Sequence, residues 1–235
     1  MNNVLLDNIL RGKTKILNLL FLVFIISITG SIYYVFAANT STFNQTINSG
    51  TLTVDIVDDT YVTVSAPSIN MSTLSFGFTC QTSTGTFGTT TQQIYVKNPD
   101  AADNGWTVSL AGSSTTAVWD SAGTDFDFND PNGSGCIDGG TDADSLGGQM
   151  TVDPSAGSIS VGSCSTCTTT GVSTGSSSAF SEGGPDSITI IAGASGSDDI
   201  GDWTLQGVSI SQKVPAEQPA ASDYAINMVL SILAQ

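Results

Sequence analysis

Short runs in which apolar and polar residues alternate follow one another from residue 51 to residue 235, and this period of two is typical of half-buried β-strands. Turns rich in Gly, Pro and Asn separate the runs. The pattern predicts strands at residues 51–64, 71–80, 93–97, 106–110, 150–152, 159–161, 187–191, 203–211 and 224–232. No amphipathic helical period follows residue 38. We therefore predict an all-β fold, with a single antiparallel β-sandwich over residues 51–235.

Two stretches between the runs lack this alternation. Residues 81–91 are rich in Thr and Gly, and residues 162–178 consist almost entirely of Ser, Thr, Gly and Cys. Both predict connections rather than strands. In the last run, Tyr224, Ile226 and Met228 fall on one face of the predicted strand, which we expect to be the buried face.

The N-terminal part has a different pattern. Residues 16–36 are apolar and uncharged, they follow the basic residues Arg11, Lys13 and Lys15, and the small residue Ala37 comes next. This order predicts an N-terminal apolar helix that serves as an export signal over residues 1–37, cleaved after Ala37. Export would place the folded part outside the cell, at the cell surface.

An uncleaved membrane anchor is the alternative, because residues 16–36 are about as long as the roughly 20 residues that a transmembrane helix needs. The chain would then contact the membrane only through residues 16–36. The polar arm that follows, residues 38–50, has Phe43 and Ile47 as isolated apolar residues.

The charge of the chain is strongly one-sided, with 21 acidic and 5 basic residues and a formal net charge of −16. Residues 1–37 hold one of these acids and three of these bases, so the remainder has 20 acids, Lys97 and Lys213, and a net charge of −18. Such a surface repels phosphate backbones, and we expect no nucleic-acid partner. It attracts divalent cations or cationic polymers, or it only keeps an exposed protein soluble.

The sequence has no histidine, the commonest general base and the commonest metal ligand. A Ser-His-Asp or Cys-His arrangement therefore cannot be built. A two-carboxylate hydrolase needs no histidine, but among so many acids a carboxylate pair is not a specific signal. We predict a protein that is not an enzyme, without catalytic or cofactor-binding residues.

Four cysteines, Cys80, Cys136, Cys164 and Cys167, follow the export segment. Two disulfides are expected in an oxidising compartment, and three pairings are open. We favour Cys80–Cys136 with Cys164–Cys167, because the second pair lies in a Gly/Ser/Thr-rich run where a small loop can close. A redox Cys-x-x-Cys would need a strand–helix context, and a zinc site would normally show two close pairs.

An acidic insert at residues 117–153 offers oxygen ligands for calcium, the one metal that the sequence suggests. The candidate ligands are Asp125, Asp127, Asn129, Asp130, Asp138, Asp142 and Asp144. The run at 125–129 begins like a calcium-binding loop, but the glycine and the closing Glu of such a loop are absent. The alternative is an edge strand with Phe126 and Phe128 inward and the acids in solvent.

Two segments, residues 97–114 and 202–232, resemble the WxL-type surface domains of bacteria. The residues that carry the resemblance are Trp106, Leu110, Trp203, Leu205, Pro215 and Tyr224. The resemblance implies a β-sandwich exposed at the cell surface, in some relatives bound to the cell wall. The Trp-x-Leu that ends the family's last strand is absent here. Packing in the core is the alternative role for both tryptophans.

The start of the chain is similar to camelysin-type and biofilm-fibre proteins. The similarity rests on a signal, a short polar arm with a Phe, and the sequence Ser-Gly-Thr-Leu-Thr-Val at residues 49–54. It implies that the arm can add a strand to a neighbouring subunit.

These observations lead to three hypotheses of function. The first is a surface or cell-wall-associated interaction protein, which binds a cell-wall or surface polymer or other surface proteins. The second is a structural subunit of an extracellular fibre or surface layer that self-assembles through its arm. The third is a carbohydrate-binding or carbohydrate-active protein that uses the acidic insert.

Overall fold

The computed structural model describes residues 2–33, 44–48, 50–99, 104–139, 144–182, 187–196 and 200–235. For residues 2–10 and 28–33 it describes the helical backbone alone. Phe43 of the arm and Asp142 of the acidic insert lie outside the described residues. The chain divides into two compact units, Met1–Ile47 and Asn48–Gln235.

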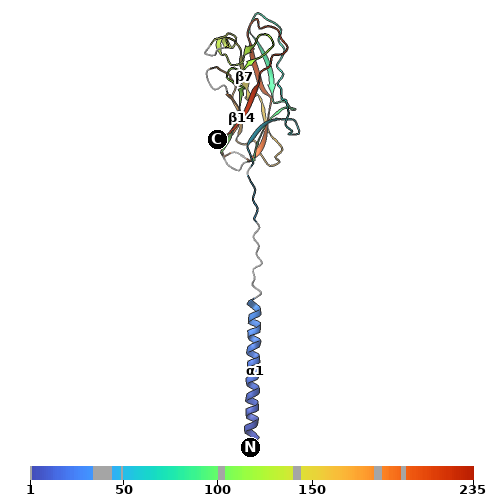
Figure 1. Ribbon diagram of the computed structural model, residues 1–235, viewed down its shortest axis with the longest axis vertical. Helices are drawn as coiled ribbons and strands as arrows, with labels where there is room; N and C mark the ends of the chain where they lie inside the picture. The colour runs from blue at the N-terminus through green and yellow to red at the C-terminus, as the bar shows by residue number, and fades with distance from the viewer. Residues whose placement is uncertain are drawn as a thin grey trace. The chain divides into compact units, whose positions relative to one another are not determined.

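The first unit contains the helix α1 (Asn2–Tyr33), which confirms the predicted N-terminal helix (Figure 1). The apolar side chains described for it are exposed, for example Leu17 and Phe24. Among the described residues, no helix is long and apolar enough to cross a membrane. Residues 34–36, the end of the apolar segment predicted as a signal or anchor, lie outside the described residues.

The second unit is built from short strands. They are β1 (Thr53–Val57), β2 (Gln81–Phe87), β3 (Gln93–Asn98), β4 (Trp106–Gly112), β5 (Val118–Trp119), β6 (Phe126–Asp127), β7 (Gln149–Asp153), β8 (Ser158–Val161), β9 (Val172–Thr174), β10 (Ser178–Ala179), β11 (Ser187–Gly193), β12 (Gly201–Gln206), β13 (Val208–Val214) and β14 (Met228–Ala234). Two short 3-10 helices, η1 (Asn132–Ser134) and η2 (Pro154–Ala156), lie between them.

Within the described residues, these strands form three four-stranded sheets and one two-stranded sheet. Sheet I has the order β1-β3-β12-β8, sheet II the order β10-β7-β13-β2, and sheet III the order β14-β4-β11-β9. The strands β5 and β6 form the small sheet. The pairings are antiparallel, so the predicted all-β, antiparallel character is confirmed.

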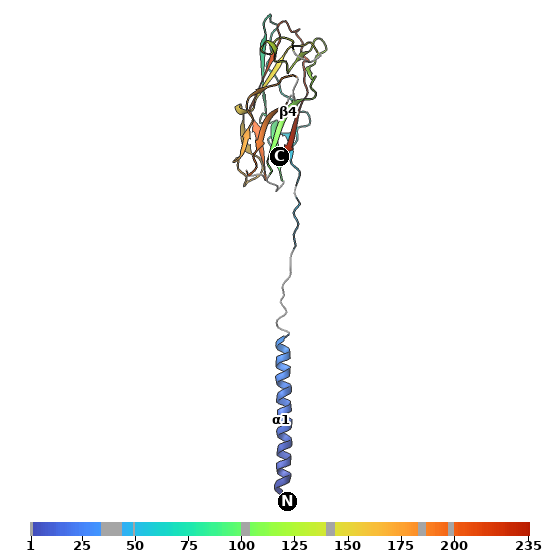
Figure 2. The ribbon, with the colours of Figure 1, turned by 90° about the vertical axis from the view of Figure 1, so that its left-hand side faces the viewer.

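Sheets I and III contact each other along both of their edges, β1 with β14 and β8 with β9. Figure 2 shows β4 beside the C-terminal strand β14 of sheet III. Trp106 of β4 and Trp203 of β12 meet between the two sheets.

Sheet II follows sheet I in the chain, because β12 passes directly into β13 at Gly207. The φ of Gly207 is 82°, in the left-handed region that favours glycine. Residues 203–211, predicted as one strand, are therefore two strands in different sheets.

One hydrophobic cluster joins all three sheets. Its largest fully buried members are Trp106, Trp203, Phe128, Phe180, Ile94, Ile190, Ile191 and Leu205. Alternation explains much of this cluster, but β11 buries the adjacent Ile190 and Ile191 at a register shift, and residues 202–205 of β12 are all buried.

The structure corrects three predictions around the first strands. Strand β1 ends at Val57 instead of continuing to residue 64, because Asp58 accepts hydrogen bonds from Thr60 and Val62 and closes a turn. Residues 71–80 form no strand. Residues 81–87 form strand β2 despite their Thr and Gly content, because pairing with β13 decides their conformation.

The predicted connection at residues 162–178 also contains a strand, because Val172–Thr174 forms β9 and pairs with β11. In the last run, Tyr224, Ile226 and Met228 share the less exposed face, which confirms the predicted alternation. The strand itself begins at Met228.

Candidate functional site

The tryptophans of the WxL-like segments belong to the core. Trp106 and Trp203 are both 0% exposed, and their ring centroids lie 5.5 Å apart. Trp203 Nε1 donates a hydrogen bond to Thr168 O at 2.8 Å. Leu110 and Leu205 are buried as well. Core packing is confirmed as the role of both tryptophans, so their rings are not available to a ligand.

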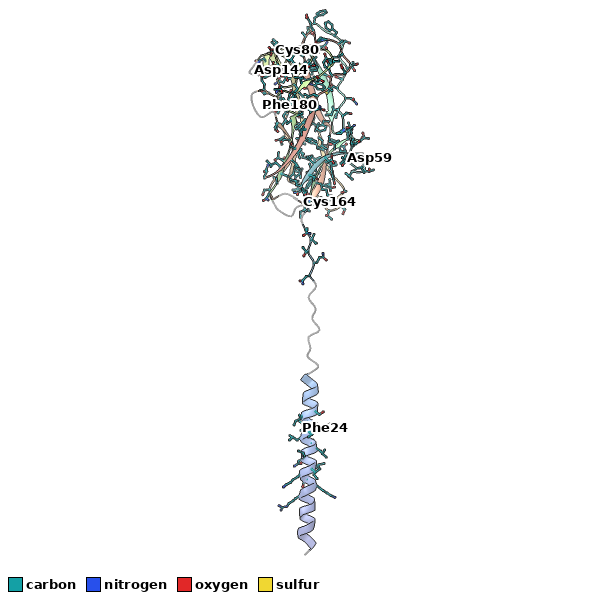
Figure 3. The ribbon with its side chains drawn as sticks, in the orientation of Figure 1. Phe24, Asp59, Cys80, Asp144, Cys164 and Phe180 are labelled. Carbon is teal, nitrogen blue, oxygen red and sulfur yellow. A yellow bond between two sulfur atoms is a disulfide. The ribbon has the colours of Figure 1, made fainter. Side chains whose placement is uncertain are left out.

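The disulfides are Cys80–Cys136 and Cys164–Cys167, which confirms the favoured pairing. Cys80 and Cys164 lie at opposite ends of the β unit in Figure 3. Because structural disulfides persist where the surroundings are oxidising, the two bridges indicate an oxidising environment.

Asp202 of β12 holds the loop that carries the second disulfide. It is 4% exposed. Its Oδ2 accepts hydrogen bonds from Tyr95 Oη at 2.6 Å and from Ser163 N and Oγ at 2.7 Å, and its Oδ1 accepts one from Cys164 N at 2.8 Å. Burial opposes ionisation, but the hydrogen bonds from Ser163, Tyr95 and Cys164 outweigh it and lower the pKa of Asp202. Burial and the bond to Asp202 raise the pKa of Tyr95 to about 12.

Among the described residues, one group of three potential metal ligands has its ligand atoms within 4.8 Å of one another: Cys164, Cys167 and Asp202. Metals bind thiolates, and both sulfur atoms are bonded to each other here. The group is therefore structural and fixes the loop on β12. The sequence gives no signal for this role of Asp202, because its hydrogen-bond partners lie far away in the chain.

The acidic insert carries its phenylalanines inward as expected, with Phe126 at 5% and Phe128 at 0% exposure. The expectation that its acids are in solvent is wrong for Asp127 and Asp130, which are each 1% exposed. Asn129 is buried to the same extent. This insert therefore contributes to the core as well as to the surface.

The described acids of the insert bind the backbone around them. Asp127 Oδ1 accepts a hydrogen bond from Phe128 N at 2.6 Å, and Asp125 Oδ1 accepts one from Ser121 N at 3.0 Å. Asp130 accepts bonds from the N–H groups of Asn132 and Gly139, and Asp144 accepts one from Leu146 N. Asp138 is exposed. The structure gathers no three of the described acids of this insert into one ligand group, and the calcium site stays a prediction.

A groove of about 600 Å³ opens between the edge strands of sheets I and III. Its walls carry half-buried side chains of β1 and of the C-terminal segment, and its floor consists of buried core residues. The wall residues are Val54, Ile56, Ile226, Met228 and Leu230, and the floor residues are Phe87, Leu110, Met150 and Ile210. The groove is therefore an opening into the hydrophobic core along two sheet edges.

The two edges differ in how their backbone groups are used. On the β1 side, Ile56 N donates to Asp55 Oδ1 at 2.8 Å, and Ile56 O accepts from Val64 N at 2.9 Å. The side chain of Asp55 and the turn after β1 thus close this edge at Ile56.

On the β14 side, Asn227 O accepts a hydrogen bond from Ser113 N, and Gln235 N donates one to Gly105 O. Odd-numbered residues of this segment therefore bond toward β4. By the alternation of an antiparallel ladder, Met228, Leu230 and the other even-numbered residues direct their N–H and C=O groups to the open side.

Edge strands of natural proteins are usually protected by charged residues, proline or bulges. Strand β14, with the sequence Met-Val-Leu-Ser-Ile-Leu-Ala, has neither a charged residue nor a proline. Its even-numbered residues direct their backbone groups away from β4, beside apolar side chains that line the groove, and part of the strand contacts β1. Such an edge is suited to bind an extended segment, with main-chain bonds for affinity and pockets for alternate side chains.

Comparisons of the chain with protein-family models, with curated proteins and with solved structures give no match. The resemblances to WxL-type domains and to camelysin-type proteins therefore stay predictions.

Proposed function

We propose that the protein is an exported, non-catalytic surface protein with a single β-sandwich, and that its copies assemble into an extracellular fibre or surface layer by strand addition. The observation that carries this proposal is the groove beside β14, which joins an uncharged strand edge to an apolar cavity. The two disulfides support an oxidising destination. The absence of histidine from the sequence supports a non-catalytic role.

The proposed donor segment is the polar arm at residues 38–50 of a neighbouring copy. Phe43 and Ile47 are four residues apart, so in an extended segment both side chains point to the same face. That spacing fits a groove that receives alternate side chains. Ile47 is 88% exposed in the single chain, and its burial in the groove would favour assembly by about 1.5–3 kcal/mol.

The test compares the protein that starts at Ala38 with a form that lacks residues 38–49, by light scattering and electron microscopy, with and without calcium. We expect the first to form polymers and the second to stay monomeric. A synthetic peptide of residues 38–50 should bind the shortened form. If the protein that starts at Ala38 stays monomeric at high concentration in both conditions, assembly by strand addition is wrong.

Two adjacent residues of β14 supply a matched pair of variants. Met228→Lys places a charge at the groove, whereas Val229→Lys places the same charge on the opposite face, where Val229 is already 45% exposed. We expect Met228→Lys to abolish polymer formation and Val229→Lys to leave it intact. Equal loss in both variants would assign the effect to charge on the strand and not to the groove.

A further inference from the structure

A second cavity, of about 420 Å³, is lined by four aromatic residues, Phe76, Trp119 of β5, Phe126 of β6 and Tyr224. Residues 71–77 and 214–224 supply most of the rest of its lining, including Pro215. The alternating pattern of residues 71–80 predicts a strand and gives no signal of a cavity. The cavity is separate in chemistry from the acidic part of the insert, although β5 and β6 belong to that insert.

The aromatic rings are held in place without a ligand. Trp119 and Phe126 stack with an interplanar angle of 11° and centroids 5.7 Å apart, and Phe126 meets Tyr224 edge-on at 5.0 Å. Trp119 Nε1 donates to Gln212 Oε1 at 2.9 Å. Gln212 is 1% exposed, and its Nε2 donates to the backbone oxygens of Asp127 and Lys213. A ring fixed in this way loses little conformational freedom when a ligand binds.

The lining of the cavity contains no charged residue among the described part of the chain. This is unusual for a domain with 20 acids and two lysines after residue 37. Polar groups are present as Ser and Thr hydroxyls and as the amides of Gln81 and Gln218. The side-chain amide of the half-buried Gln81 lies against Gly77 and makes no hydrogen bond to another described residue. An uncharged lining disfavours ionic ligands, because a buried charge needs a partner.

A peptide strand fits this cavity poorly, because the neighbouring sheet edge is already covered. Ser72 N donates to Thr84 O of β2 at 2.7 Å, and Glu217 N donates to Gly77 O at 2.8 Å. Main-chain groups of an added strand would find no free edge beside β2. This cavity and the groove share Met71, Trp119 and Tyr224, but the groove lies along a strand edge that this cavity lacks, so the two suit different occupants.

From the fixed aromatic rings, the amide of Gln81 and the uncharged lining, we propose that this cavity binds a neutral carbohydrate. The apolar face of a sugar ring packs on an aromatic side chain, and its hydroxyl groups exchange hydrogen bonds with amides and hydroxyls. Trp119 and Tyr224 supply the aromatic surface, and Gln81 supplies the polar contact. This site deepens the proposed surface role by naming a class of surface polymer that the protein binds.

The experiment uses the chain from Ala38 with Met228→Lys, so that glycan binding is measured on a form that does not depend on assembly. The probes are neutral oligomers of β-1,4-linked glucose and N-acetylglucosamine, with an oligomer of galacturonate as the anionic comparison. Trp119 is the half-buried tryptophan, whereas Trp106 and Trp203 are fully buried. A saturable change in tryptophan emission therefore reports on Trp119, and calorimetry gives the affinity independently.

We expect at least one neutral oligomer to bind and the anionic oligomer to bind at least about 10-fold more weakly. Gln81→Leu should weaken binding about 2- to 10-fold, the range of one neutral hydrogen bond. Gln235→Leu, at an exposed amide on the C-terminus, is the matched control and should leave binding unchanged. No binding of either neutral oligomer, equal binding of the anionic oligomer, or equal effects of the two Gln→Leu variants would overturn the proposal. Failure here leaves the polymerisation test of the groove unaffected.

Discussion

Removal of the two disulfides, one at a time, should cost very different amounts of stability. The ends of the Cys80–Cys136 bridge are 56 residues apart, whereas those of the Cys164–Cys167 bridge are 3 apart. In the chain-entropy model, loops of these lengths stabilise the folded state by about 4 kcal/mol and about 1.5 kcal/mol at about 25 °C. Replacing each pair by alanines should therefore lower the free energy of unfolding about 2.5 kcal/mol more for the long loop.

The native contacts add to this difference. The short loop keeps the hydrogen bonds from Ser163 and Cys164 to Asp202 when the sulfur atoms are gone, because backbone N–H groups and a hydroxyl make them. The assay is urea unfolding of both double-alanine variants and the parent protein, followed by tryptophan emission. Equal losses, or a larger loss for the Cys164–Cys167 pair, would refute the loop-length reasoning.

Three further predictions concern single positions. Asp202→Asn should lower the free energy of unfolding by about 1.5–3 kcal/mol at neutral pH. The folded state lowers the pKa of Asp202, so this contribution to stability exists above the ordinary pKa of 3.8 and is lost as the pH falls through the lower folded value. The stabilities of parent and variant, measured by urea unfolding, should therefore converge in acid. Gly207→Ala should cost about 1–2 kcal/mol, measured by urea unfolding, since φ is 82° and a Cβ meets no atom closer than 3.6 Å, which leaves backbone strain as the only cost. N-terminal sequencing of the exported protein should return Ala38, and recovery of Met1 or Asn2 would contradict cleavage.

Where a strand had alternating side chains and a clear stop, the sequence was sufficient to predict it. Residues 93–97 and 106–110 became β3 and β4 with nearly the expected bounds. Residues 71–80 have the same alternation, yet Phe76 and Phe78 pack edge-to-face on each other and remain 53% and 77% exposed. A period of two reports which side chains share a face, and it does not report whether a partner strand is present.

The candidate sites depend on contacts that a single sequence does not contain. The alternation in residues 224–232 predicted the face of Ile226, Met228 and Leu230, but the groove exists because β1, β2 and β14 all lie at sheet edges. The Trp119–Gln212 hydrogen bond joins residues 93 positions apart. Local propensity gives no signal for such pairs, and so the uncharged cavity beside Trp119 was not predicted.

The unequal protection of the two edges determines what kind of assembly strand addition would produce. The edge at β1 is closed at Ile56 by Asp55 and by the turn after Val57, whereas the even-numbered residues of β14 direct their backbone groups away from β4. One copy thus offers one acceptor edge at the groove. The proposed donor, residues 38–50, is a different part of the same chain. Contacts between unlike surfaces are head-to-tail, and they generate open filaments or rings unless two copies exchange their arms reciprocally. A closed two-fold dimer arises when two copies exchange their arms reciprocally, so particles no larger than two copies in light scattering would indicate reciprocal exchange in place of a filament.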